Sequence, residues 1–333
     1  METTHKQIVL GILAHVDSGM LYRSGAIRKL GRVDHKDAFL DTDTLEKARG
    51  ITIFSKQALL TAGNTDITLL DTPGHVDFST ETERTLQVLD YAVLVVSGTD
   101  GVQSHTETLW RLLRRYHVPT FVFVNKMDLP GKSREELLAQ LNHRLGEGFV
   151  AFDVPQADRD EALALCDENL MDRMLDAGQL TDADLIPAVA RRHVFPCWFG
   201  SALRRTEDDA LESVDALMDG IDRYTRPAPA LDAFGAKVFK VSQDEQGTRL
   251  TWLRVTGGEL KVKAQLSGEA DGEPWEEKAN QLRLYSGVKY TLAEAIGPGQ
   301  VCAVTGLSHT RPGQGLGEEG ESGPPELEPV LHY

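Results

Sequence analysis

The sequence feature that most constrains the fold is the alternation of strand-sized apolar runs with helical stretches across the first 224 residues. The runs 8–14, 91–96 and 120–124 are almost entirely apolar, as strands buried on both faces are. Stretches with helical periodicity, such as 106–116 and 134–144, lie between such runs. We therefore predict an α/β domain with a doubly wound, mostly parallel sheet and helices on both faces. Ligands of such sheets bind beyond the carboxyl ends of the strands.

The other segments of this part fit the same alternation. Ser133 is predicted to cap the helix that follows it, with Glu136 three residues later completing a capping box. A turn at Gly63-Asn64 indicates a hairpin between two strands. The remaining strands are expected at 57–61, 66–70 and 194–199, and the remaining helices at 78–89, 160–176, 181–193 and 211–224.

A linker signal at 226–230, Arg-Pro-Ala-Pro-Ala, marks a change of pattern. Beyond it, short strand-like runs are separated by Gly, Asp and Pro turns, which is typical of a small antiparallel β-barrel. The stretch 313–333 is rich in Gly, Pro and Glu, which predicts a linker or extension. We therefore divide the chain into an α/β domain at 1–226, a β-barrel domain at 227–312 and this extension. The barrel strands are expected at 235–241, 249–256, 259–262, 280–285, 289–292 and 300–305.

The bulk properties are those of a cytoplasmic globular protein. A formal charge of −16, from 35 basic and 51 acidic residues, argues against a protein that coats nucleic acid by charge alone, although it allows a local basic patch. The cysteines Cys166, Cys197 and Cys302 are widely spaced without a metal-ligand pattern, which indicates thiols in a reducing compartment. The first residues lack a secretory pattern and the apolar runs are strand-sized, so we expect no membrane segment.

Residues 69–75, Leu-Leu-Asp-Thr-Pro-Gly-His, form the first candidate site. An apolar strand ends in Asp71, and a Pro-Gly turn leads into a helix. A carboxylate at a strand end can hold Mg²⁺ through water, because hard cations prefer oxygen ligands. The backbone N–H of Gly74 can approach a phosphate closely. Taken alone, the segment is explained equally well as an ordinary strand–turn–helix connection.

The second candidate site is Asn125-Lys126-Met127-Asp128, which again follows a buried strand. The Asp128 carboxylate can accept two N–H bonds, from N1 and the exocyclic amine of guanine, which adenine cannot offer. Asn125 would brace the loop, and the stem of Lys126 would cover the plane of the base. The alternative is a polar turn after a strand, and so short a motif also arises by chance.

Two weaker candidates follow the same pattern. In 199–203, Phe-Gly-Ser-Ala-Leu, the backbone N–H groups of Ser201, Ala202 and Leu203 can meet the O6 atom of guanine. Thr52, within Arg-Gly-Ile-Thr-Ile, can offer its hydroxyl and carbonyl oxygens to Mg²⁺ and sense a γ-phosphate. Taken singly, each segment is better explained as a strand boundary.

In combination, the four segments occur in the order and at the strand ends typical of the G motifs of GTPases. Asp-Thr-Pro-Gly-His at 71–75 with Arg-Gly-Ile-Thr-Ile at 49–53 resembles translational GTPases, and within them the elongation factor G branch. The stretch 11–19 (Gly-Ile-Leu-Ala-His-Val-Asp-Ser-Gly), with 24–27 and 43–46, most resembles ribosomal-protection tetracycline-resistance proteins. The resemblance covers essentially the whole chain, although elongation factor G and peptide-release relatives share most of these motifs.

The resemblance implies a P-loop GTPase that binds GTP or GDP with Mg²⁺ and hydrolyses GTP when the ribosome stimulates it. Asp71 and Thr52 would serve Mg²⁺, Gly74 would donate to the γ-phosphate, and His75 would be the catalytic residue that orients the attacking water. The implied partners are the rRNA and proteins of the ribosome, and the implied state is a monomer. Guanine would be read by Asn125, Lys126, Asp128, Ser201, Ala202 and Leu203, and the phosphates would be wrapped by the backbone of His15, Val16, Asp17, Ser18 and Gly19.

The phosphate-binding loop departs from the family pattern. Such a loop needs G-x-x-x-x-G-K-[ST], with Ala often first among relatives, but here Ala14 to Gly19 is followed by Met20-Leu21. Aligning the residues from Leu21 onward with relatives suggests a gap of about seven residues, or about two helical turns. The lysine that would neutralise the β- and γ-phosphates and the threonine that would ligate Mg²⁺ are absent from the sequence.

This gap leads to a prediction about activity and leaves its origin open. Losing two or more charge-assisted hydrogen bonds, each worth about 1.5–3 kcal/mol, should weaken nucleotide binding at least roughly a hundredfold. We therefore predict no detectable GTP hydrolysis by this chain. The gap is explained by residues omitted from the sequence, by a natural or engineered deletion, or by a homologue that does not hydrolyse GTP.

The alternative function is then a GTPase-like module that docks on the ribosome or another partner without turnover. An adenine-nucleotide protein is a third reading, which the motif at 125–128 disfavours. Members of the elongation factor G branch continue with three more domains. The residues that would displace tetracycline or drive translocation are therefore expected outside this chain.

Overall fold

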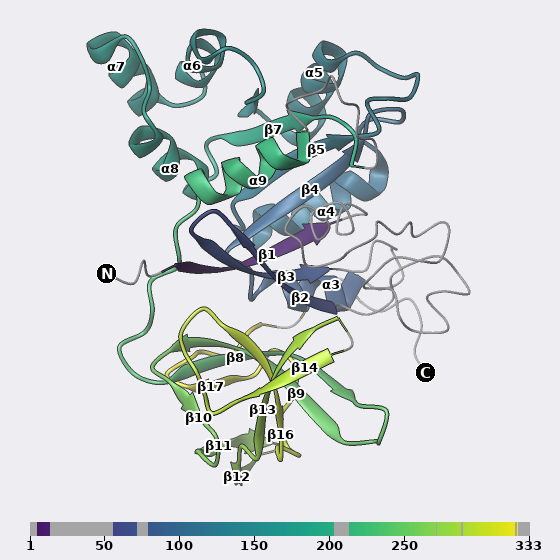
Figure 1. Cartoon of the computed structure of the whole chain (residues 1–333), viewed down its shortest axis with the longest axis vertical. Helices are drawn as coiled ribbons and strands as arrows, with labels where there is room; N and C mark the ends of the chain where they lie inside the picture. The colour runs from purple at the N-terminus through teal and green to yellow at the C-terminus, as the bar shows by residue number, and fades with distance from the viewer. Residues whose placement is uncertain are drawn as a thin grey trace.

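A seven-stranded sheet forms the centre of the N-terminal half of the molecule (Figure 1). The computed structural model describes residues 5–13, 56–71, 79–202, 213–270, 272–287, 289–323 and 325. The strand order is β2-β3-β1-β4-β5-β7-β6, and each pair of neighbours is parallel except the hairpin of β2 and β3. This arrangement confirms the predicted mostly parallel sheet. The strands are β1 (Lys6–Leu13), β2 (Lys56–Ala62), β3 (Thr65–Asp71), β4 (Tyr91–Ser97), β5 (Thr120–Asn125), β6 (Phe149–Ala151) and β7 (Phe195–Phe199).

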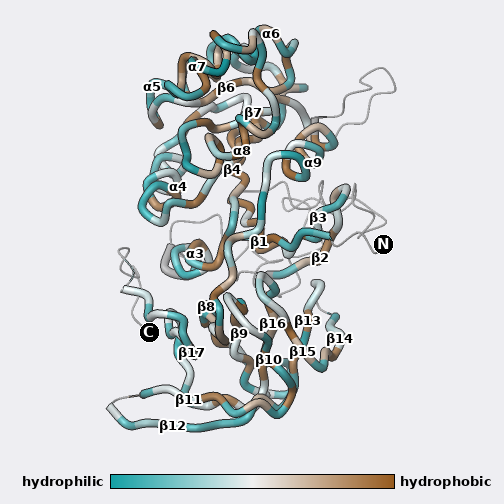
Figure 2. Tube along the Cα trace, turned by 90° about the vertical axis from the view of Figure 1, so that its left-hand side faces the viewer, coloured by the Kyte–Doolittle hydropathy of each residue, from teal (hydrophilic) through white to brown (hydrophobic). Residues whose placement is uncertain are grey.

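Helices cover both faces of this sheet, and each face has its own hydrophobic core. The helices α3 (Ser79–Leu86), α4 (Ser104–Arg115) and α5 (Arg134–Leu145) contribute leucines such as Leu112 and Leu141 to one core. The other core holds side chains of four further helices. In the hydropathy view brown residues lie along β4, and teal and brown residues alternate along helices such as α6 and α7 (Figure 2). The helices of the second face are α6 (Gln156–Ala164), α7 (Glu168–Ala177), α8 (Asp182–Ala190) and α9 (Ser213–Tyr224).

The structure corrects two details of the predicted α/β domain. The single helix expected at 160–176 is two helices, because the Asp167 side chain accepts hydrogen bonds from Asn169 N (2.8 Å) and Leu170 N (3.2 Å) and starts a new helix there. The strand β6 was not predicted, since three residues carry too little periodicity to be recognised. Among the described helices, none combines the length and apolarity needed to cross a lipid bilayer.

The capping box predicted for α5 is present and supports a stability prediction. Glu136 N donates to Ser133 Oγ at 3.2 Å, and Ser133 N donates to Glu136 Oε2 at 2.8 Å. We expect Ser133→Ala to lower the free energy of unfolding by about 1 kcal/mol, because one N–H of the first turn loses its acceptor. Urea unfolding measures this loss. Ser104→Ala in the first turn of α4 is the control, with an expected change within about 0.5 kcal/mol; equal losses in both variants would contradict the prediction.

The C-terminal half is an antiparallel β domain, as predicted (Figure 1). A six-stranded sheet of order β14-β13-β16-β9-β8-β17 and two two-stranded sheets enclose a core that includes Leu253 and Val304. The hairpin β11–β12 was not predicted, because most residues of its strands are polar and no apolar run marks them. Gly315–Gly317 (β17), within the stretch expected to be an extension, pairs with β8. The other strands are β8 (Gly235–Gln243), β9 (Arg249–Gly257), β10 (Leu260–Lys261), β11 (Gln265–Ala270), β12 (Glu273–Lys278), β13 (Gln281–Ser286), β14 (Lys289–Ala293), β15 (Ala295–Ile296) and β16 (Val301–Thr305).

A buried ion pair joins the two halves. Arg254 Nη2 of β9 donates to Asp90 Oδ1 at 2.6 Å, and Arg254 Nη1 donates to the carbonyl oxygen of Val88 at 3.0 Å. The second oxygen of Asp90 accepts a hydrogen bond from Val9 N of β1 at 2.8 Å. Both charged residues are 8% exposed. The ion pair therefore links the barrel directly to the backbone of β1, an inner strand of the sheet.

Other contacts extend this junction to β2 and α3. Gly287 N, in the turn after β13, donates to the carbonyl oxygen of Gln57 at 2.8 Å, and Leu59 N donates to Ser286 Oγ at 3.3 Å. Lys240 of β8 forms an ion pair with Glu81 of α3 at 3.2 Å. The junction is thus polar at its rim. Its apolar centre consists of Val9, Leu70, Val88, Phe239 and Val301.

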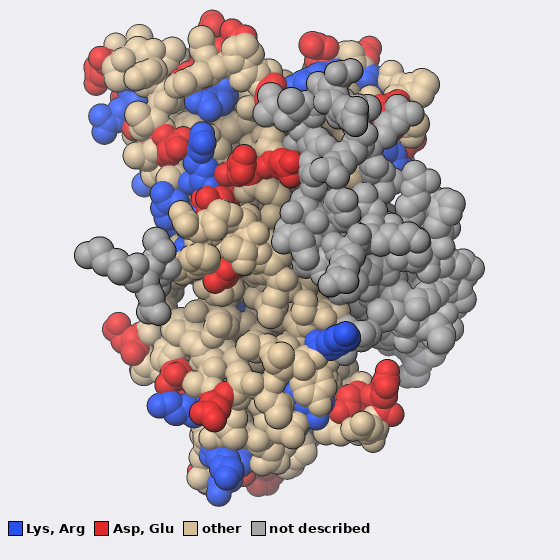
Figure 3. All heavy atoms as spheres, in the orientation of Figure 1, with Lys and Arg blue, Asp and Glu red and all other residues tan. Residues whose placement is uncertain are grey.

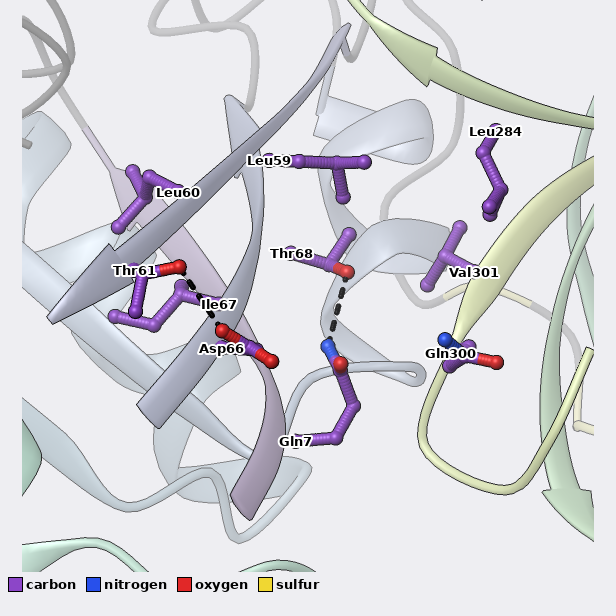
Figure 4. A pocket seen from close by; sticks show the side chains of 10 residues that line it. All are labelled: Gln7, Leu59, Leu60, Thr61, Asp66, Ile67, Thr68, Leu284, Gln300 and Val301. Carbon is purple, nitrogen blue, oxygen red and sulfur yellow. Dashed lines mark hydrogen bonds between the residues drawn. The ribbon is translucent and has the colours of Figure 1, made fainter. Parts of the chain in front are cut away.

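The two halves leave a cavity of about 260 Å³ between them (Figure 4). Side chains of β1, β2 and β3 face it from one side, and Leu284, Gln300 and Val301 face it from the barrel. Gln7 Nε2 donates to Thr68 Oγ1 at 3.3 Å on its wall. The cavity mixes apolar and polar groups. We propose the domain boundary at the linker 226–230, between α9 and β8.

Candidate functional site

The carboxyl ends of the parallel strands lie along one edge of the sheet. At this edge the direction in which successive strands are added to the sheet reverses. β3 lies on one side of β1 and β4 on the other, so the connections from β1 and from β3 lead in opposite directions. Doubly wound sheets bind their ligands beyond the strand ends at such a switch point. Among the candidate residues, Asp71 ends β3, Asn125 ends β5, and Ser201 and Ala202 follow β7, so all of them lie at this edge.

The side chain of Asn125 joins two of the candidate loops. Its Oδ1 atom accepts hydrogen bonds from Lys126 N at 2.8 Å and from Ala202 N at 2.9 Å. A second link between the loops is the hydrogen bond from Met127 N to the carbonyl oxygen of Gly200 at 3.0 Å. The segments 125–128 and 200–202, which are far apart in the sequence, therefore form one structural unit.

The backbone at Lys126 adopts an unusual conformation. Its φ angle is +65°, in the left-handed region that residues other than glycine seldom occupy. Leu129 N donates to the carbonyl oxygen of Lys126 at 3.1 Å and closes a turn that contains Asp128. Lys126 and Asp128 are exposed at the sheet edge. Backbone strain of this kind, stabilised by surrounding hydrogen bonds, is typical of ligand-binding segments.

The end of β7 is held by charged groups next to the candidate loops. Arg134, the first residue of α5, forms an ion pair with Asp153 and places its guanidinium 4.8 Å from the ring centre of Phe199. Asp153 Oδ2 accepts a hydrogen bond from Phe199 N at 3.1 Å. Ser201 and Ala202 are half-buried. The N–H of Ala202 donates to Asn125 Oδ1, so among the described residues the predicted contact with a base edge falls to the N–H of Ser201.

Asp71 occupies a buried position at the end of β3. It pairs with Ile12 of β1 across the parallel register and is 5% exposed. It is the one oxygen donor of the predicted Mg²⁺ site within the described residues. The described part of the chain contains no group of three or more His, Cys, Asp or Glu side chains placed to hold a metal ion.

Several predicted site residues lie outside the described residues. Among the described residues, the structure brings together the base-reading candidates Asn125, Lys126, Asp128, Ser201 and Ala202. The residues outside the description are His15, Val16, Asp17, Ser18, Gly19, Thr52, Gly74, His75 and Leu203.

The turn after β4 was not singled out in the sequence, although it meets the Asn125 loop. Gly98 N donates to the carbonyl oxygen of Asn125 at 2.7 Å. The Asp100 carboxylate accepts hydrogen bonds from Ser97 Oγ (2.7 Å) and Thr99 Oγ1 (2.9 Å), and these bonds hold the pKa of Asp100 below its usual value. The signal that could have found this turn is its composition, Ser-Gly-Thr-Asp-Gly directly after a buried strand.

On the face of the molecule shown in Figure 3, acidic and basic side chains are interspersed over the helices and the barrel. The described residues of this face form no continuous basic surface. The absence of a basic surface among the described residues of this face agrees with the formal charge of −16. Any contact with nucleic acid on this face would therefore depend on local groups rather than on overall charge.

The chain is similar to a known protein family and to several known proteins. The model of the family described as "Elongation factor Tu GTP binding domain" matches residues 5–227. The tetracycline resistance protein TetM of Streptomyces lividans is 34% identical over 97% of the chain, and elongation factor G of Mycoplasma genitalium is 31% identical over 93%. The crystal structure of a Thermus thermophilus protein superposes with a TM-score of 0.78 over 95% of the chain and 55% of its own, at 23% identity, which indicates a shared fold.

The chain is shorter than these relatives in two respects. It spans 55% of the length of TetM, of the oxytetracycline resistance protein of Streptomyces rimosus, which is also 34% identical, and of the elongation factor G. The alignments with the two resistance proteins extend over 356 and 368 positions, more than the 333 residues of the chain. The chain therefore lacks internal segments that those relatives carry. These similarities confirm the resemblance that the motifs predict.

Proposed function

The chain belongs to the elongation factor Tu GTP-binding domain family, and from this premise we propose that it binds guanine nucleotides and acts with the ribosome. The observation that carries the proposal is the position of Asn125 Oδ1, which accepts from Lys126 N and Ala202 N and joins the two base-reading loops. Asp128 would accept two N–H bonds from guanine, and the stem of Lys126 would cover the base. The backbone N–H groups of Ser201 and Leu203 would meet its O6 atom, since that of Ala202 donates to Asn125 Oδ1.

The phosphates and Mg²⁺ are assigned to the neighbouring strand ends. The segment 15–19 begins two residues after the end of β1 and would wrap the phosphates with its backbone. Asp71 and Thr52 would hold Mg²⁺, which supplies positive charge between the phosphate oxygens when bound. Gly74 would donate to the γ-phosphate, and His75 would orient a water molecule for hydrolysis. Buried Asp71, at the end of β3 beside β1, supports this assignment.

GTP hydrolysis at the ribosome is the activity implied by the family, and the missing Lys-[ST] pair favours a second function. With Met20-Leu21 after Gly19, this chain has neither the lysine charge nor the hydroxyl ligand that Walker-type loops supply. We propose that the chain as it stands is a guanine-nucleotide-binding module that docks on ribosomal RNA and proteins without measurable turnover. It would act as a cytoplasmic monomer.

Within the family, we propose the ribosomal-protection kind associated with tetracycline resistance. Two relatives with resistance in their names are 34% identical to the chain, whereas five elongation factors G are 28–31% identical. The segments 11–19, 24–27 and 43–46 support the same choice. Pelleting of the chain with ribosomes tests whether it binds them at all, and absence of the chain from the pellet would contradict this role.

The test of nucleotide recognition is direct binding of fluorescent GDP to the purified chain, with its intact mass measured first. A mass near 36.7 kDa identifies the chain as written here. We expect weak binding that unlabelled GDP displaces and ADP does not, because adenine offers no partner for the Asp128 carboxylate. Displacement by both nucleotides would favour an adenine-nucleotide protein. With ribosomes present, we expect no phosphate release above background, and ribosome-stimulated release would overturn the non-hydrolysing assignment.

A further inference from the structure

The turn after β4, residues 97–101, forms hydrogen bonds and close backbone contacts with the base-reading loop, residues 125–132. Gly98 is buried, and its N–H donates to the carbonyl oxygen of Asn125 at 2.7 Å. In return, the carbonyl oxygen of Gly98 accepts a hydrogen bond from Lys132 N at 3.3 Å. The turn therefore contacts the loop 125–132 near both of its ends.

Glycine occupies the two points of closest approach. A Cβ atom at Gly131 would lie 2.8 Å from the Gly98 carbonyl oxygen and 2.9 Å from Thr99 Cα, both backbone atoms that cannot rotate away. A Cβ atom at Gly98 would lie 2.7 Å from Met127 Sδ and 3.0 Å from the Asn125 carbonyl oxygen. A side chain at Gly131 would push the turn and the loop apart, and one at Gly98 would displace the Met127 side chain.

A set of polar contacts fixes the turn itself. The Ser97 and Thr99 hydroxyls both donate to the Asp100 carboxylate, which closes the turn on itself. Lys132 Nζ donates to the carbonyl oxygens of Asp100 (3.0 Å) and Thr99 (3.4 Å). The ammonium group thus ties the end of the loop, just before α5, to the turn.

We propose that this turn is the positioning element of the base-reading loop, with Gly98, Gly131 and Lys132 as positioning residues that set where Asp128 presents its carboxylate. The inference rests on the proposed guanine site, because it assigns the specificity of that site to residues that do not touch the base. Asn125 fixes the loop to the segment after β7, and the turn after β4 fixes it from the other side. The left-handed Lys126 directly follows Asn125, whose side chain bonds to the segment after β7 and whose carbonyl oxygen bonds to the turn after β4.

The inference predicts a change in base selectivity rather than in binding alone. Inosine diphosphate lacks the exocyclic amine of guanine, so the ratio of the IDP to the GDP dissociation constant reports how well the Asp128 carboxylate meets that amine. We expect Gly131→Ala to lower this ratio about tenfold, the effect of misplacing one hydrogen bond to a charged group. Lys132→Met should lower it less, and Lys132→Arg should restore it in part. Gly320→Ala, where a Cβ meets nothing within 4 Å, is the control.

A second readout keeps the test independent of nucleotide binding. Hydrogen exchange of the Lys126 and Ala202 amides, both bonded to Asn125 Oδ1, should be faster in Gly131→Ala than in Gly320→Ala. A lowered ratio with faster exchange supports the inference, and a ratio within twofold of the unaltered chain overturns it. If the unaltered chain binds neither nucleotide, the proposed function fails, and exchange alone decides whether the turn positions the loop: faster exchange supports this and equal exchange rejects it.

Discussion

Replacing Arg254 by alanine is expected to lower the free energy of unfolding by about 3–5 kcal/mol, since it leaves the buried carboxylate of Asp90 without its cation. The Asp90 side chain is 2% exposed, so its carboxylate has little bulk water to solvate the charge that Arg254 balances. The Val88 carbonyl oxygen also loses its hydrogen bond from Arg254 Nη1. Chemical denaturation followed by tryptophan fluorescence and circular dichroism measures the loss. We expect the two halves to unfold separately in this variant.

The matched control is Arg311→Ala in the same domain. Arg311 pairs with Glu321, but the two side chains are 55% and 51% exposed, so the expected loss is about 0–1 kcal/mol. If Arg254→Ala does not fold, Arg254→Lys keeps a charge and should lose less. Asp90→Asn combined with Arg254→Met removes both charges and leaves an acceptor for Val9 N, so it should recover most of the stability. Equal losses for Arg254→Ala and Arg311→Ala would disprove the prediction.

Asn125→Ala is expected to raise the GDP dissociation constant roughly 10–100-fold. The substitution removes the acceptor of Lys126 N and Ala202 N, two hydrogen bonds that hold both base-reading loops, each worth about 0.5–1.5 kcal/mol. Fluorescence titration with labelled GDP at a temperature where the variant is folded measures the change. Asn125→Asp keeps an acceptor oxygen at the same position and should bind more tightly than the alanine variant.

Asn142 supplies a control for general damage to the fold. Like Asn125, it bridges two segments: Nδ2 donates to the carbonyl oxygens of Leu138 (3.1 Å) and Phe149 (2.9 Å), and Oδ1 accepts from Phe149 N (3.1 Å). Asn142→Ala should lose stability as Asn125→Ala does, yet the folded variant should bind GDP as the unaltered chain does. A similar loss of affinity in both variants would show that Asn125 acts through stability alone.

The α/β fold is predictable from the sequence because its strands are buried on both faces. Continuous apolar runs such as those of β1, β4 and β5 have no other stable place than the centre of a layered domain. The strands that escaped prediction lack this signal. β12, for example, has exposed residues at most positions and buries Trp275 against the barrel core, so its pairing with β11 is a tertiary property.

The candidate site is only partly predictable, since motifs identify residue types and the fold decides which of them meet. Asn125 was expected to brace its loop, but the partner at Ala202 depends on the adjacency of β5 and β7. The turn at 97–101 has the composition of many surface turns, and its contact with the loop depends on the backbone distance between Gly98 and Gly131. No periodicity or spacing in the sequence encodes that distance.

The contact of the β13–β14 turn with β2 also bears on self-association. β2 is the outermost strand of the seven-stranded sheet, and Gly287 and Ser286 occupy part of its outward edge. An exposed edge strand presents unpaired backbone N–H and C=O groups that can pair with another chain and start aggregation. The barrel thus shields a surface on which copies of the α/β domain could pair. If the chain were cleaved at the linker 226–230 and the barrel lost, the remaining domain would expose the outer edge of β2, to which strands of other copies could pair.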